Sequence, residues 1–175
     1  MLHSHCRPFG KSLSNPVHKI EIADEQSRSF ESQSLISAVT NILTDHGILR
    51  SELSIAVVDD PTIRQLNQQY LNHDYATDVI SFILDHDEDT SWLSGQLIVS
   101  SDTADSMARK IGGSMQDELL LYVVHGTLHL VGFNDKIPSE AAEMRTAEKK
   151  YLTDFGVEYR WSHDEATPDD CEEST

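Results

Sequence analysis

Two histidines spaced four residues apart, His125 and His129, are the clearest candidates for chemistry in this sequence. On a helix this spacing places both imidazoles on one face, where they can bind a single metal ion. Gly132 interrupts the apolar stretch that carries them, and a chain that turns back after it would bring Asp135 to the same point. Two histidines, a carboxylate and an open fourth position are typical of a catalytic zinc site. The pattern therefore predicts a metal site made of His125, His129 and Asp135.

Other interpretations of these residues stay open at this point. The histidines can instead be core residues bonded to main-chain or carboxylate partners, since burying an imidazole without a partner costs free energy. Asn134 is an alternative third ligand, although its neutral amide oxygen is a poorer one than a carboxylate. A zinc peptidase of the H-E-x-x-H type is disfavoured, because Gly126 occupies the position of the general-base glutamate and glycine cannot accept a proton.

The spacing of apolar residues predicts the elements that would position these side chains. Residues 115–131 are apolar on nearly all sides, which predicts a central buried helix, and Ser114 with Asp117 resembles a capping box at its start. The other predicted helices cover 31–46, a segment capped by Asp60 with Pro61 as its first residue, a segment capped by Ser101 or Asp102 that ends at Gly112, and 138–155. The predicted strands cover 18–23, 53–58, 79–84 and 96–99, with an acidic turn at 85–91. This mixture predicts one α/β (α+β) domain with a small sheet covered by helices.

Length and composition limit the classes of protein to which the chain can belong. Its 175 residues, 38% of them hydrophobic, suit one domain with its own core. No apolar run is long enough to cross a membrane and no signal-peptide core is present, so we expect a cytoplasmic protein. Cys6 and Cys171 lie near opposite ends, which implies no disulfide framework. We expect disordered tails at 1–17 and 161–175 around a domain over 18–160.

The net charge of −17 argues at first against a nucleic-acid partner, which usually requires a basic surface. The acidic residues are unevenly spread, however. Ten of the 30 lie in two local runs, at residues 85–89 and 164–173. The rest of the chain is only mildly acidic, so the net charge does not exclude an RNA substrate. It predicts instead that binding to free RNA is weak and sensitive to salt.

Several motifs together resemble the YbeY family of bacterial metal-dependent endoribonucleases. The segment VVHGTLHLVGFND, which ends at Asp135, is similar to the family signature H-G-x-L-H-L-x-G-Y-D-H. Further stretches resemble the family's L-N, T-D-V-L-S-F and G-D-I-x-I-S motifs and its spaced Met and Glu. They lie at Leu66-Asn67, Thr77–Phe82, Gly95–Ser100, Met144 and Glu148. Order and spacing agree over residues 18–156.

The resemblance implies a small mixed four-stranded sheet with helices on both sides and a zincin-like metal helix. His125 and His129 match the family's first two zinc ligands, whereas Asp135 stands where the third ligand is usually a histidine. Aspartate binds zinc and tolerates Mn²⁺ or Mg²⁺ better than histidine does, so we expect one zinc ion or another divalent ion.

The resemblance also implies a function. It is a single-strand-specific endoribonuclease that acts in small-subunit ribosomal RNA maturation and ribosome quality control. The implied partners are ribosomal RNA and ribosome or assembly proteins, with no membrane and no DNA. The alternative is a non-catalytic ribosome-assembly factor whose metal is structural.

Four more polar residues are candidates for supporting roles or need an explanation. The family often carries an arginine shortly after L-N-x-x-Y, where this chain has Leu71, and His73 is the nearest cationic candidate for a catalytic role. Asp78 is expected either to brace its loop or to orient a ligand histidine. Lys136 is a candidate phosphate contact, or else an ordinary surface lysine. Glu118, two helical turns before the first histidine, is expected to be solvated.

Overall fold

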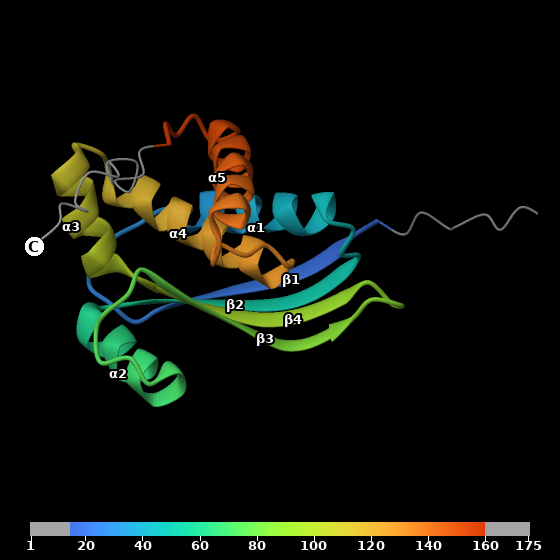
Figure 1. Ribbon diagram of the computed structural model, residues 1–175, viewed down its shortest axis with the longest axis horizontal. Helices are drawn as coiled ribbons and strands as arrows, with labels where there is room; N and C mark the ends of the chain where they lie inside the picture. The colour runs from blue at the N-terminus through green and yellow to red at the C-terminus, as the bar shows by residue number, and fades with distance from the viewer. Residues whose placement is uncertain (1–14, 160–175) are drawn as a thin grey trace, which may run out of the picture.

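The computed structural model describes residues 15–159, which form one sheet and five helices (Figure 1). The strands are β1 (Val17–Asp24), β2 (Arg50–Val58), β3 (Val79–Asp87) and β4 (Trp92–Ser100). The helices are α1 (Ser32–Asp45), α2 (Asp60–Leu71), α3 (Ser101–Ile111), α4 (Met115–Leu130) and α5 (Pro138–Thr153). The predicted tails at 1–17 and 161–175 lie outside the described residues, apart from residues 15–17, and Val17 already belongs to β1. Within the described part of the chain, no helix has the length and apolarity needed to span a membrane.

The sheet has the strand order β1-β2-β4-β3 and is mixed, as the resemblance implies. β1, β2 and β4 run parallel, with Ile20 opposite Leu53 and Ile55 opposite Leu97. β3 pairs antiparallel with β4 as a hairpin, which makes it the edge strand next to the parallel part. One irregularity interrupts this pairing between Ile83 and residue 85.

All four strands extend beyond their predicted ends, β1 by one residue at each end. β2 begins three residues earlier than expected and β4 four residues earlier, while β3 continues through Asp87. The acidic turn is therefore shorter than predicted, because Asp85 and Asp87 pair with Ser94 and Trp92 across the hairpin. Most of these outer positions carry polar side chains, and Ser94 and Gly95 separate the apolar pair Trp92-Leu93 from the predicted strand, so the apolar pattern alone does not reveal them.

Helices cover both faces of the sheet (Figure 1). α1, α3, α4 and α5 lie on one face, whereas α2 lies on the other. α4 is the central helix, in contact with α1, α3, α5 and the strands β3 and β4, and α5 lies across it. The main core is formed between the sheet and α1, α4 and α5, and a smaller apolar cluster under α2 joins Val58, Ile63, Ile80 and Ile98.

Two helix caps differ from the predicted ones by one residue. Asp59, and not Asp60, caps α2 by accepting a hydrogen bond from the main-chain N–H three residues later (2.9 Å). Ser100, and neither Ser101 nor Asp102, caps α3 in the same way (3.1 Å). The Asp60 carboxylate is instead directed toward α3, where its Oδ1 accepts from Ser100 Oγ (2.5 Å). The starts of the two helices are thus tied together at the ends of β2 and β4.

Candidate metal centre

α4 carries both candidate histidines through the interior of the protein. Its first turn is capped by Ser114, whose Oγ accepts a hydrogen bond from the main-chain N–H of Asp117 (3.1 Å), as predicted. Twelve of its 16 residues are buried, which confirms the predicted central helix. A polar side chain on such a helix is stable only if its polar atoms have partners. The partners of His125 and His129 therefore decide what these residues can do.

Gly126 lies beside His125 where α4 packs tightly against the sheet. A Cβ atom at this position would lie 2.9 Å from Leu97 Cδ2 and 2.9 Å from Val79 Cγ2. Real Cβ atoms essentially never approach other heavy atoms so closely. The glutamate of an H-E-x-x-H peptidase would require these two side chains or the helix to shift, so the close packing favours glycine at this position.

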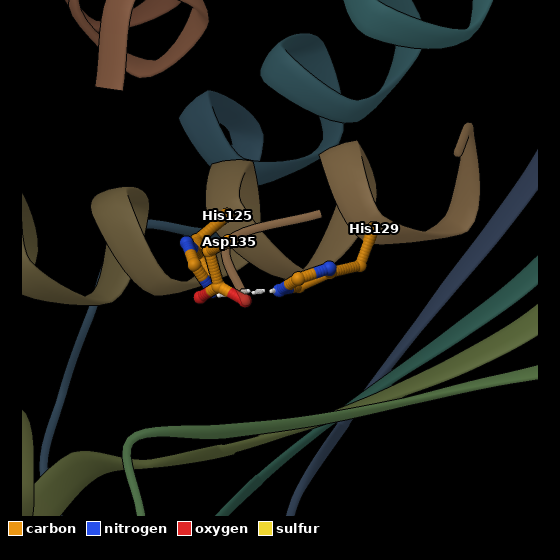
Figure 2. A group of neighbouring side chains, drawn as sticks. All are labelled: His125, His129 and Asp135. Carbon is orange, nitrogen blue, oxygen red and sulfur yellow. Dashed lines mark hydrogen bonds and ion pairs between the residues drawn. The ribbon is translucent and has the colours of Figure 1, made fainter. Parts of the chain in front are cut away.

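The turn after α4 brings Asp135 back to the two histidines (Figure 2). Gly132 adopts a φ of +101°, which glycine tolerates because it has no Cβ. Asp135 Oδ2 then lies 3.7 Å from His125 Nε2 and 3.8 Å from His129 Nε2. One potential ligand atom from each residue lies within 4.8 Å of the others. The structure thus brings together the three residues that the sequence singled out.

Hydrogen bonds at the other ring nitrogens fix the orientation of both imidazoles. His125 Nδ1 lies 2.6 Å from Glu148 Oε1, and His129 Nδ1 lies 3.0 Å from the Phe133 carbonyl oxygen. A carboxylate and a carbonyl can only accept, so each Nδ1 carries the proton and donates it. In the neutral rings, each Nε2 then presents a lone pair, and the two Nε2 atoms lie 2.9 Å apart. With both rings neutral this brings two acceptors face to face, which is unfavourable unless a proton or a metal ion lies between them.

The charges around the two rings have opposite effects on their pKa values. Burial disfavours the charged form of His125, but the hydrogen bond and charge of Glu148, with Asp78 and Asp135, outweigh it and raise its pKa above the ordinary value. Burial, together with the positive charge of His125, lowers the pKa of His129. The surroundings therefore favour one proton on this pair of rings and oppose a second.

The site opens to solvent on the side of the carboxylate. The exposed fraction of the side chain rises from 11% at His125 to 26% at His129 and 45% at Asp135. Two imidazole nitrogens and one carboxylate oxygen form a donor set that suits zinc and other divalent ions. The residues present therefore fit a metal ion with access to a substrate from solvent.

The alternative third ligand, Asn134, is exposed at the surface beside Asp135. It lines a surface hollow of about 270 Å³ together with Glu140 and Glu143 of α5. Asp135, the next residue, is the one that points toward the histidines (Figure 2).

Asp78 braces the loop that leads into β3. Its Oδ1 accepts hydrogen bonds from Thr77 Oγ1 and from the main-chain N–H of Val79, both at 2.8 Å. Its charge also helps to raise the pKa of His125. The local brace is the role that its hydrogen bonds show, whereas Glu148 and the Phe133 carbonyl orient the two candidate ligand histidines.

His73 and Lys136 do not belong to the group of three. His73 is exposed in the loop after α2, where its ring stacks on Tyr75 with centroids 5.4 Å apart. Lys136 is exposed directly after Asp135. Leu71, in the slot of the family's arginine, is the last residue of α2 and is also exposed.

Glu118 contradicts the expectation that it is solvated. It is only 6% exposed. Burial raises the pKa of its carboxyl to about 7, an effect that the hydrogen bond from Tyr122 opposes and the charges of Asp117 and Asp78 reinforce. The expectation was wrong because α4 is covered by other helices already in its first turns.

Two residues that support the site were missed by the sequence reasoning. Glu148 matches a family position, but its role could not be predicted, because its contact with His125 joins residues 23 positions apart in the sequence. Tyr159, whose hydroxyl donates to Glu148 Oε2 (2.8 Å), had no motif to reveal it. The signal that could have found Glu148 is a single acidic residue on the otherwise apolar inner face of the last helix.

Comparisons with known proteins agree with this picture. The family model of Endoribonuclease YbeY matches residues 14–156. Relatives named Endoribonuclease YbeY include one from Rhodopirellula baltica, 39% identical over 130 residues that span 73% of this chain and 66% of that protein. Another, from Salinibacter ruber, is 36% identical over 135 residues, which span 74% of this chain and 86% of that protein.

A solved structure shares the fold. The solution structure of TM1509 from Thermotoga maritima superposes with a TM-score of 0.54 at 26% sequence identity. The superposition covers 78% of this chain and 87% of that one.

Proposed function

The chain belongs to the endoribonuclease YbeY family, and from this premise we propose that it is a metal-dependent endoribonuclease specific for single-stranded RNA. We further propose that it acts in the cytoplasm, in small-subunit ribosomal RNA maturation and ribosome quality control. The observation that carries the proposal is the convergence of His125 Nε2, His129 Nε2 and Asp135 Oδ2 on one solvent-accessible point.

In this proposal, His125, His129 and Asp135 hold one divalent metal ion, zinc or a harder ion such as Mn²⁺. When bound, the ion would act as a Lewis acid toward a phosphodiester and lower the pKa of an attacking water. Glu148 holds the proton on His125 Nδ1, and the Phe133 carbonyl holds that on His129 Nδ1, so that both Nε2 atoms stay directed at the ion.

Residues around the opening would bind the RNA. Lys136 is exposed next to Asp135, where its ammonium group can reach a phosphate of a bound strand. His73, at the exposed tip of the loop before β3, is the proposed cationic or proton-transferring group in place of the family's arginine. Asp78 supports the site through its charge near His125. The acidic composition predicts weak affinity for free RNA, so ribosomal partners would supply most of the specificity.

The test compares the wild type with His129→Ala and with a matched control, His86→Ala, which removes an exposed histidine of β3. Metal content is measured by elemental analysis, and cleavage is measured on single-stranded and double-stranded ribosomal RNA fragments. We expect the wild type and the control to bind metal and cleave the single strand, and His129→Ala to do neither. Metal binding by the wild type without cleavage would favour the alternative of an assembly factor with a structural metal. A wild type that binds no metal would contradict the proposed site itself.

A further inference from the structure

Glu148 on α5 is a buried carboxylate with a different donor at each oxygen. Its Oε1 lies 2.6 Å from His125 Nδ1, and its Oε2 accepts a hydrogen bond from the Tyr159 hydroxyl (2.8 Å). The residue is 1% exposed, so water cannot replace either donor without a rearrangement. The two donors, His125 and Tyr159, therefore fix the rotation of the Glu148 carboxylate about its Cγ–Cδ bond.

The chain after α5 is folded back so that Tyr159 reaches this carboxylate. Gly156 adopts a φ of +70°, and the main-chain N–H of Val157 donates to the Leu152 carbonyl (3.1 Å), which closes a turn at the end of the helix. Lys149 lies over the Tyr159 ring, with its Nζ 4.9 Å from the ring centroid. The ring is thus held against α5 with its hydroxyl directed inward.

We propose that Tyr159 is a positioning residue of the metal centre that acts through Glu148. Its hydroxyl holds the carboxylate in the orientation that receives Nδ1–H of His125, and so keeps Nε2 of that ring directed at the metal. The inference rests on the proposed metal site. Tyr159 lies three residues beyond residues 14–156, the segment that the family model matches.

A metal-binding histidine binds its ion more tightly when a hydrogen-bonded partner holds its ring in the correct orientation. A partner that bonds a metal-binding histidine directly is typically worth roughly 10- to 100-fold in metal affinity. Tyr159 is one bond farther from the metal, so the loss of its hydroxyl should cost less, about three- to tenfold. The ring itself stays in Tyr159→Phe, which preserves the packing and the contact with Lys149.

The experiment measures the Kd for Zn²⁺ by competition with a chelator in the full-length protein. It uses the wild type, Tyr159→Phe, Glu148→Gln and the double variant, with Co²⁺ absorption spectra to report the geometry of the site. We expect Tyr159→Phe to weaken binding about three- to tenfold and Glu148→Gln roughly 10- to 100-fold. The double variant should bind no more weakly than Glu148→Gln alone, because Tyr159 acts through that carboxylate.

Tyr151→Phe is the matched control. Like Tyr159→Phe, this substitution removes one tyrosine hydroxyl. The Tyr151 hydroxyl lies on α5 and donates to Asp45 (3.2 Å), away from the metal site. Its Zn²⁺ affinity should equal that of the wild type, whatever the change in thermal stability.

Wild-type affinity in Tyr159→Phe, or additive losses in the double variant, would overturn the inference and leave the metal site standing. If the wild type itself binds no Zn²⁺ or Co²⁺, the proposed metal site fails and this inference fails with it.

Discussion

The Nδ1–H of His129 donates to the main-chain carbonyl of Phe133, 3.0 Å away, so the turn that ends α4 also orients the second candidate ligand. Two residues later, the same turn places Asp135 Oδ2 3.8 Å from Nε2 of that histidine. The orientation of one ligand and the position of another therefore depend on a single reversal of the chain at Gly132. Because this reversal brings Asp135 to the two histidines, the metal affinity of the site should depend on the residue at position 135.

Substitution of Asp135 should change both the affinity for metal and the choice of metal. Asp135→Asn replaces a charged ligand with a neutral one and should weaken Zn²⁺ binding by about an order of magnitude or more. Asp135→His restores a set of three histidines and should retain Zn²⁺ while it reduces the affinity for Mn²⁺, which prefers oxygen ligands. Titration calorimetry with both ions checks these outcomes. Asp89→Asn, an exposed substitution in the hairpin turn, serves as the control, and equal Zn²⁺ affinity in Asp135→Asn would exclude Asp135 as a ligand.

Gly126→Ala should destabilise the fold. The added Cβ would lie 2.9 Å from both Leu97 Cδ2 and Val79 Cγ2, so these side chains or α4 itself must shift. Overpacking of this kind costs about 1–3 kcal/mol, more than the helix propensity gained by alanine. Gly113→Ala is the control, because its Cβ would meet only Ile111 at ordinary distances of 3.6 and 3.7 Å. Urea unfolding of both variants gives the comparison, and equal stability would refute the close packing at Gly126.

Zinc should stabilise the folded protein through the proposed site. A ligand that binds only the folded state at a hundredfold excess over its Kd adds about 2.7 kcal/mol to the free energy of unfolding. We expect this increase in the wild type and its absence in His129→Ala, measured by denaturant unfolding with Zn²⁺ or with a chelator. An equal response of both proteins to Zn²⁺ would place the binding elsewhere.

The three candidate ligands could be predicted because the signals that unite them are local. His125 and His129 are one helical turn apart, and Gly132 marks the reversal that returns Asp135, so all three lie within eleven positions of the chain. The central helix could be predicted equally well, since its sequence is apolar on nearly every side. The family membership, the mixed four-stranded sheet and the helices on both faces agree with what the motif resemblance implied.

The supporting residues could not be predicted, because their contacts join distant parts of the chain. Glu148 meets His125 only after α5 has crossed α4, and Tyr159 reaches Glu148 only through the turn at Gly156. Glu118 was misplaced for a related reason: a charged residue on a helix is ordinarily solvated, and only the packing of the other helices buries it.

Stability should fall with rising pH because of Glu118, and Glu118→Gln should remove this effect. Burial first of all raises the pKa of this carboxyl from 4.5 to about 7 in the folded protein, so between these values the folded state binds more protons than the unfolded state. The contribution of the neutral carboxyl to stability is therefore fully present below about pH 4.5 and is lost as the pH rises through about 7.

Glutamine cannot ionise and resembles the protonated carboxyl in size. Glu118→Gln should accordingly match the wild type near pH 4.5 and exceed its free energy of unfolding by about 1–3 kcal/mol near pH 8. Urea unfolding at both pH values measures the difference, with Glu143→Gln, an exposed substitution on α5, as the control that should show none. If the difference between Glu118→Gln and the wild type were the same at both pH values, Glu118 would not titrate in this range in the folded protein. The free-energy cost of burying the charged Glu118 carboxylate would then have to be offset by a partner that stabilises the charge.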